Sequence, residues 1–344
     1  MTKKSKVKII KISVSIVAVL LVLFLIVPYS VSAIVLHVVF DRRFETEDYL
    51  RFSVQDFQGL QTERHTFDSE SGQTLVGYRY YTDNISPKGL VVLSHGFGGG
   101  GQNGYLDVSD YFVRHGYEVF AYDMTGNDES GGKVRGLERG IIDLNGAIAY
   151  AKERFSLPTL LWGHSAGGYA SLCALAYNEG ITAVASVASF HCASDMLKVQ
   201  GVKYGGAASE VFLAYVRSVQ RMKFGKYAGS CGIDAAKDST AKVFIAQGTA
   251  DETVPVEYGY QDYYNEFSPD PRFRFFQAEG KGHTDILYSA EGWAYTLSLQ
   301  SAVEGCSAEE ERREVIKNID RTKLCSRLNE ELFEQIVNFY DECV

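Results

Sequence analysis

An apolar run that ends in a glycine-bracketed serine constrains the fold more than any other stretch of this chain. The residues from Leu160 to Trp162 lead directly into Gly163-His164-Ser165-Ala166-Gly167, which has the pattern G-x-S-x-G. Small residues around Ser165 permit a tight turn from strand to helix, and such a turn exposes a serine hydroxyl at the end of a strand. We therefore expect Ser165 to be a nucleophile, against the alternative of an ordinary loop serine.

Apolar runs alternate with helical patterns on both sides of this turn. Two runs, at 63–67 and 74–81, flank a turn containing glycine and predict a hairpin. The alternation predicts an α/β fold with a central, mostly parallel sheet and helices on both faces. The apolar runs expected as buried strands are 89–94, 118–122, 160–164, 181–189, 242–246 and 273–276.

Two residues near the ends of later strands supply what a serine nucleophile needs, namely a base and a carboxylate that orients it. Asp251 follows the strand at 242–246, and His283 lies in a glycine-flanked loop after the last strand. Parallel strands end at one edge of a sheet, so we expect Ser165, Asp251 and His283 to meet there. Asp195 is an alternative for the acid.

A serine mechanism also needs backbone N–H groups directed at the negative charge that develops on the substrate oxygen. Ala166 supplies one because it follows the nucleophile, and Phe97, in the glycine-rich loop after the strand at 89–94, is expected to supply the other. His95 and His164 are expected to brace these loops through hydrogen bonds. This chemistry requires no metal ion and no organic cofactor.

The amino-terminal segment predicts a membrane helix. No charged residue occurs from Ile12 to Phe40, and five lysines precede this run. The lysines favour a cytoplasmic amino terminus and a catalytic domain outside the cytoplasm. Residues 1–41 are thus expected to form a signal-anchor and residues 42–344 the catalytic domain. The alternative is secretion after cleavage of a signal peptide near Ala33.

The region after the strand at 181–189 interrupts the alternation for about fifty residues. A connection of this length predicts a cap over the site, at about 191–240. The charged stretch 307–324 is expected to be a surface helix, and the apolar spacing within 328–343 predicts a closing helix. Cys173 is expected to be a buried thiol, whereas Cys306, Cys325 and Cys343 are open candidates for disulfide pairing outside the cytoplasm.

Charge and spacing argue against several other functions. The net charge of −9 and the mixing of basic with acidic residues argue against nucleic acid as a partner. The loop from Gly96 to Gly101 fits a dinucleotide-binding pattern with Asp123 as the ribose acid, but that reading leaves the serine, histidine and aspartate unexplained. A catalytically inactive surface-binding module is the non-enzyme alternative.

Several motifs together resemble the α/β-hydrolase superfamily, particularly its lipase, esterase and serine-aminopeptidase-like branch. The resemblance spans about residues 60–344. It implies an α/β-hydrolase fold, and a Ser165–His283–Asp251 triad that cleaves carboxylic esters through an acyl-enzyme. Peptidase, thioesterase and acyltransferase are alternatives, and the substrate expected is a small-molecule or lipid acyl compound. The matching segments are His95-Gly96-Phe97-Gly98, Asp123 to Gly126 with Ser130 and Gly131, Gly163 to Gly167, Gly248 to Pro255, and Gly282-His283.

Overall fold

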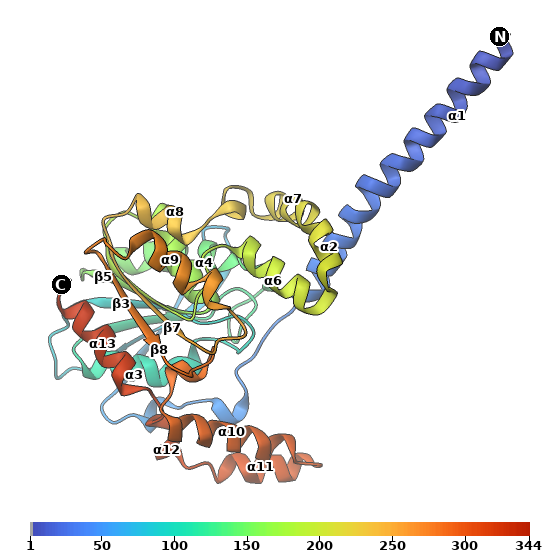
Figure 1. The fold of residues 1–344 in the computed structure, drawn as a ribbon. Helices are drawn as coiled ribbons and strands as arrows, with labels where there is room; N and C mark the ends of the chain where they lie inside the picture. Colours follow the sequence, from blue (N-terminus) through green and yellow to red (C-terminus); the bar gives the residue numbers. More distant parts are fainter. Residues whose placement is uncertain (1–2) are drawn as a thin grey trace.

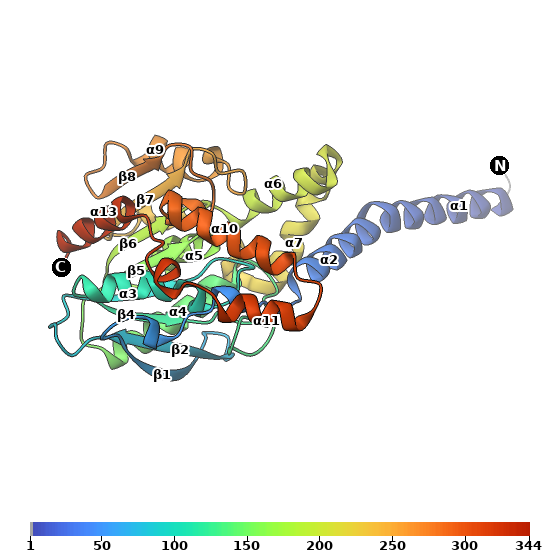
Figure 2. The ribbon, with the colours of Figure 1, turned by 90° about the horizontal axis from the view of Figure 1, so that it is seen from below.

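The computed structural model describes residues 3–344 and contains one eight-stranded sheet. The strands are β1 (Gln61–Asp68), β2 (Thr74–Tyr81), β3 (Leu90–Ser94), β4 (Glu118–Tyr122), β5 (Thr159–His164), β6 (Ile181–Val187), β7 (Lys242–Gly248) and β8 (Phe273–Ala278). Their order across the sheet is β1-β2-β4-β3-β5-β6-β7-β8 (Figure 2). The β1–β2 hairpin is antiparallel and β2 pairs antiparallel with β4, whereas every other pair is parallel. The predicted hairpin and mostly parallel sheet are confirmed.

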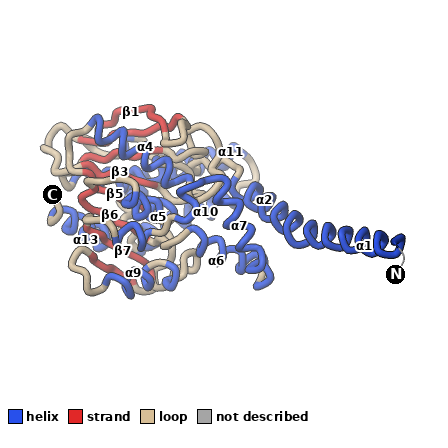
Figure 3. Tube along the Cα trace, turned by 90° about the horizontal axis from the view of Figure 1, so that it is seen from above, coloured by secondary structure: helices blue, strands red, loops and turns tan. Residues whose placement is uncertain are grey.

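Helices cover both faces of this sheet, as Figures 2 and 3 show from opposite sides. Those N-terminal to the fifth strand are α1 (Lys3–Leu21), α2 (Val27–Phe40), α3 (Leu106–Arg114) and α4 (Arg139–Arg154). Those between β5 and β8 are α5 (Ala166–Cys173), α6 (Ala193–Gly205), α7 (Leu213–Phe224), α8 (Gly232–Lys237) and α9 (Tyr260–Phe267). Those after β8 are α10 (Ala290–Glu304), α11 (Glu309–Lys317), α12 (Arg321–Cys325) and α13 (Glu330–Asp341).

The core has two layers because side chains alternate across each strand. On β3, Val92 packs on one face with residues of α4, α5, α8 and α9. Its neighbours Val91 and Leu93 pack on the other face with residues of α3, α10 and α13. The strand side chains of both layers are almost fully buried, so the strand ends are held rigidly at the edge where loops carry the candidate site residues.

The N-terminal segment forms one apolar helix, made of α1, a π-helical turn at Val22–Ile26, and α2. The helical stretch Lys4–Phe40 is long and apolar enough to cross a membrane, with a mean hydropathy of 3.0 in its most apolar window. Its first part projects from the domain, whereas α2 lies beside α7 (Figure 1). Leu36 and Phe40 are buried there with Val219. Such a helix fits either a membrane anchor or a signal sequence.

The segment between β6 and β7 contains α6, α7 and α8, within the range predicted to be a cap. A disulfide joins Cys192 to Cys231, the residues that precede α6 and α8, and a β-bridge pairs the same two residues. The ring of His191 lies 3.3 Å from the sulfur of Cys192. A metal ion would need these cysteines as thiolates, so the disulfide removes the ligands that this cluster offers.

The structure answers the open question of cysteine pairing and corrects one expectation about the carboxyl-terminal region. The three late cysteines are free thiols, and Cys192–Cys231 is the disulfide instead. The charged stretch 307–324 forms two short helices, α11 and α12, because Asp320 begins a new helix by accepting the Lys323 N–H. The predicted closing helix is confirmed as α13, whose apolar face is buried, and Cys173 is buried as predicted.

Candidate active site

Ser165 occupies a strained position between β5 and α5. Its backbone has φ 55° and ψ −121°, a conformation that residues with a side chain rarely adopt. Two hydrogen bonds hold it, from the Ser165 N–H to the Val187 carbonyl at 2.8 Å and from the Tyr169 N–H to the Ser165 carbonyl at 3.0 Å. Such a conformation costs about 1–3 kcal/mol, so it persists only where the surrounding fold enforces it.

The flanking glycines explain why this turn tolerates no larger residues. A Cβ atom on Gly163 would lie 2.3 Å from the backbone of Gly167. A Cβ atom on Gly167 would lie 2.1 Å from the Ser94 carbonyl oxygen on β3. The helix therefore starts in direct contact with the neighbouring strand, and the serine side chain is turned out of the sheet edge.

The structure brings Ser165, His283 and Asp251 into one hydrogen-bonded row. His283 Nε2 lies 2.9 Å from Ser165 Oγ, and His283 Nδ1 lies 2.8 Å from Asp251 Oδ2. A carboxylate only accepts hydrogen bonds, so Nδ1 carries the proton and Nε2 is free to accept the proton of the serine hydroxyl. The three residues follow the carboxyl ends of β5, β7 and β8, as the parallel sheet requires.

Asp251 is fixed by more than its histidine partner. Its side chain is fully buried, and Oδ1 accepts the backbone N–H groups of Thr253 and Val254, each at 2.9 Å. The alternative acid, Asp195, lies instead 3.6 Å from His191. The carboxylate that meets His283 is therefore Asp251, and the suggestion of Asp195 is not supported.

His95 and His164 brace the surrounding loops, as predicted. His164 Nε2 lies 3.0 Å from the backbone oxygen of His283, so it donates there, and its Nδ1 accepts from the Tyr105 hydroxyl at 2.9 Å. Burial, with a smaller effect from the nearby His283, lowers the pKa of His164 to about 3, which keeps this ring neutral. His95 Nε2 accepts the Met124 N–H at 3.0 Å, and its Nδ1 donates to the Gly96 carbonyl at 2.8 Å.

The loop after β3 carries Phe97, whose N–H is one of the two donors expected to face the substrate. Among residues 3–344, no acceptor takes the N–H of Phe97 or of Ala166, so both groups are available. The Phe97 ring is 40% exposed and packs against Phe40 and Phe44, with ring centroids 5.5 and 5.0 Å apart. The end of the N-terminal helix thus contacts this loop.

The side chain of Asp123 is buried against the protein backbone, which removes the basis of the dinucleotide alternative. Its side chain is buried and accepts the backbone N–H groups of Gln102 at 2.8 Å and Glu129 at 3.1 Å. Burial raises the pKa of Asp123 to about 7. Both oxygens are engaged by the protein backbone, so this residue organises loops and is not free to bind a ribose.

Tyr105 has a positioning role that the sequence does not indicate. The Tyr105 hydroxyl accepts the Gly96 N–H at 3.2 Å and donates to His164, and so joins the loop after β3 to the turn after β5. In the sequence Tyr105 follows the glycine-rich loop that begins after the strand expected at 89–94. No local pattern distinguishes it from a packing tyrosine, so only the tertiary structure reveals it.

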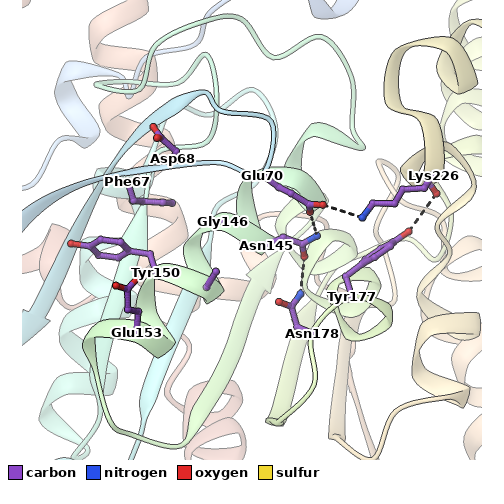
Figure 4. Close-up of a pocket in the computed structure, with 11 residues that line it drawn as sticks. Phe67, Asp68, Glu70, Asn145, Gly146, Tyr150, Glu153, Tyr177, Asn178 and Lys226 are labelled. Atoms are coloured by element: carbon purple, nitrogen blue, oxygen red, sulfur yellow. Dashed lines mark hydrogen bonds and ion pairs between the residues drawn. The ribbon is translucent and has the colours of Figure 1, made fainter.

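A separate cavity of about 520 Å³ contains none of the three residues of the row (Figure 4). It lies between the β1–β2 hairpin, α4 and the end of the β6–β7 segment. There Lys226 forms a salt bridge of 3.0 Å with Glu70, and Asn145 donates to Glu70 at 2.9 Å. These contacts fasten the β6–β7 segment to the hairpin. The lining residues are Phe67, Asp68, Glu70, Asn145, Gly146, Ala149, Tyr150, Glu153, Tyr177, Asn178 and Lys226.

Comparison with known proteins agrees with this architecture. Residues 85–223 match the family model described as "Serine aminopeptidase, S33". A monoacylglycerol lipase of Mycolicibacterium smegmatis is 33% identical over 108 residues, which is 30% of this chain and 38% of that protein. The matched region thus spans well under half of the curated relative.

Solved structures give the fold over a longer range. An esterase of Pyrococcus furiosus aligns with a TM-score of 0.58 at 16% identity, over 88% of this chain and 96% of the esterase. An acetyl xylan esterase from Paenibacillus aligns with a TM-score of 0.51 at 16% identity, over 71% of this chain and 84% of the esterase. The sheet order, the strained serine turn and these similarities lead to one conclusion: the chain has the α/β-hydrolase fold.

Proposed function

We propose that this protein is a serine hydrolase that cleaves carboxylic esters. The observation that carries the proposal is the row from Ser165 through His283 to Asp251, with distances of 2.9 and 2.8 Å and with the serine held at positive φ. In this arrangement a neutral imidazole contacts the hydroxyl that it must deprotonate, and a buried carboxylate fixes the orientation of that imidazole.

The geometry fits a two-step reaction. His283 Nε2 takes the Ser165 proton while Oγ attacks the ester carbonyl carbon, and the charge on the carbonyl oxygen is stabilised by the Phe97 and Ala166 N–H groups. Collapse of this intermediate releases the alcohol, which takes the proton from His283, and leaves an acyl group on the serine. Water then attacks the acyl-enzyme with His283 as base, which frees the carboxylic acid and restores the serine hydroxyl.

Reaction with a fluorophosphonate and turnover of p-nitrophenyl esters test this proposal. The wild-type protein should label at Ser165 and hydrolyse the esters, whereas Ser165→Ala should do neither. Ser171→Ala is a matched control, because the Ser171 hydroxyl is buried and donates to the Gly167 carbonyl. Aminoacyl p-nitroanilides in the same panel distinguish an esterase from an aminopeptidase. Absence of labelling on folded wild-type protein would favour a binding module instead.

We also propose that the N-terminal helix remains attached as a membrane anchor, with the catalytic domain outside the cytoplasm. Leu36 and Phe40 are only 3% and 4% exposed, so cleavage near Ala33 would cut through a helix that packs on the domain. The lysines before Ile12 favour a cytoplasmic amino terminus, and the Cys192–Cys231 disulfide is typical of an oxidising compartment. We expect the protein to resist carbonate extraction and to have an intact mass that still includes the residues up to residue 33. Release of a shortened chain from the membrane would refute the anchor.

A further inference from the structure

The corner formed by α6 and α7 differs in charge from the rest of the chain. Residues 196–226 contain six basic residues and one acidic residue, Glu210, in a protein of net charge −9. Lys198 and Lys226 form salt bridges with Glu210 and Glu70. The four other basic residues form no salt bridge within residues 3–344 and are exposed; they are Lys203, Arg217, Arg221 and Lys223.

Exposed apolar side chains gather on the same corner. Outside the N-terminal helix, nine large hydrophobic residues of the described chain are exposed. Four of these nine lie between residues 202 and 222. Their exposed fractions are 36% for Val202, 81% for Tyr204, 73% for Val211 and 76% for Met222. Apolar and basic groups exposed side by side are typical of a surface that enters the interface of an anionic bilayer.

The N-terminal helix places this corner at the level of the membrane. A bilayer core of about 30 Å takes about 20 helical residues, so a span that starts at Ile12 ends close to Val31. Within that range, α7 contacts the helix twice. The Tyr29 hydroxyl donates to the sulfur of Met222 at 2.8 Å, and the Tyr215 hydroxyl donates to the carbonyl of Phe24.

The views from below and above both show α6 and α7 at the same end of the domain as α2 (Figures 2 and 3). Burial of Leu36 and Phe40 against Val219 of α7 fixes this arrangement as a packed interface. Because α7 contacts the helix at residues inside the expected span, the α6–α7 corner cannot stand away from the bilayer that the helix crosses.

We propose that the α6–α7 corner, residues 196–226, docks on the anionic lipid surface of the membrane that the N-terminal helix spans. Tyr204 and Val211 enter the headgroup boundary, and Arg217 and Arg221 contact lipid phosphates. The loop that carries Phe97 contacts Phe40 at the end of the same helix, so docking holds the candidate active site at the membrane surface. This inference rests on the proposed anchor and does not depend on the hydrolase activity.

Tryptophan quenching in nanodiscs tests the docking with the full-length chain. Val211→Trp and Tyr204→Trp are compared in discs with and without brominated lipids, and the wild-type signal of Trp162 and Trp293 is subtracted. Ile85→Trp is the control, because Ile85 is 41% exposed and precedes β3, at the sheet edge opposite the site. We expect quenching at residues 204 and 211 to exceed that at residue 85 severalfold. Equal quenching at all three positions would overturn the proposal.

Charge variants test whether the lipid is anionic. In discs that contain phosphatidylglycerol, Arg217→Gln with Arg221→Gln should reduce the quenching of the tryptophan at position 211, whereas Arg154→Gln with Lys237→Gln should not. Equal quenching in discs of pure phosphatidylcholine, unaffected by the arginine changes, would overturn the choice of partner. A blue-shifted emission without quenching would indicate a second protein copy on this surface, and would also overturn it.

Two further measurements separate this proposal from the earlier ones. Carbonate extraction tests the anchor, and turnover of a soluble p-nitrophenyl ester in detergent tests the hydrolase. A protein that resists extraction and hydrolyses the soluble ester, but shows no lipid quenching at Val211→Trp, would refute the docking alone.

Discussion

Replacing Asp251 by asparagine tests the candidate active site most sharply, because the structure fixes which way the new amide must face. Oδ1 of Asp251 accepts two backbone N–H groups, from Thr253 and Val254. An asparagine at this position keeps its oxygen on those two donors, since the reverse orientation would oppose N–H to N–H. Its NH₂ group then faces His283 Nδ1, where the carboxylate oxygen was.

This orientation reverses the tautomer of the histidine. With a donor in front of it, Nδ1 of His283 must accept, so the ring proton moves to Nε2, which faces Ser165 Oγ. A protonated Nε2 cannot take the serine proton. Loss of the same carboxylate in a well-studied serine protease lowers kcat about 10⁴-fold, equivalent to about 5.5 kcal/mol, and we expect a similar loss here.

The assay is p-nitrophenyl ester turnover beside thermal unfolding. We expect Asp251→Asn to lose about four orders of magnitude in kcat. It should keep a Tm close to that of the wild-type protein, because both backbone donors remain satisfied. Asp195→Asn is the matched control and should retain activity, since Asp195 lies beside His191. Turnover within tenfold of wild type by a folded Asp251→Asn protein would refute the assigned orientation and the role of this carboxylate.

Three other predictions concern stability, each measured by unfolding in detergent. Burial raises the pKa of Glu138 to about 7 from 4.5. Between pH 5 and 7 the folded protein therefore holds a proton that the unfolded chain releases, so the free energy of unfolding should fall as the pH rises, and should fall less in Glu138→Gln. An unchanged slope would contradict this. The Cys192–Cys231 disulfide closes a loop of 39 residues, so its reduction should lower the free energy of unfolding by about 4 kcal/mol. A Tm that does not change with reductant would contradict the presence of this disulfide. Arg327→Met should lower the free energy of unfolding by about 3–5 kcal/mol, because it leaves the buried Asp107, 2.8 Å away, without its partner. The double variant Arg327→Met with Asp107→Leu should recover most of that loss.

The sequence was sufficient to predict the sheet and the meeting of the three site residues, for a physical reason. Parallel strands end at one edge, so residues just past the ends of β5, β7 and β8 are brought together wherever the helices lie. The neighbours that finish the site depend on tertiary packing. Tyr105 and Phe40 reach it from distant elements, and no periodicity in either segment indicates that contact.

The disulfide and the broken carboxyl-terminal helix show two other limits. Cys192 and Cys231 are 39 residues apart, and their pairing depends on how α6 and α7 fold back between them. The charged residues spread along 307–324 predict a single helix, and they do not indicate the break between α11 and α12. Asp320 caps α12 through the Lys323 N–H, and an aspartate at this place is a recognisable start signal.

The disulfide between Cys192 and Cys231 closes the chain between them into a loop that could be exchanged without changing the sheet. The two Cα atoms lie 4.5 Å apart, so the whole excursion through α6 and α7 leaves and returns at nearly one point. A grafted sequence that begins and ends at this pair would leave the register of β6 with β7 unchanged. Four buried residues of this segment that reach the core, Ala193, Met196, Phe224 and Tyr227, would need equivalents. A single module could therefore be exchanged while Ser165, Asp251 and His283, which lie outside it, stay as they are.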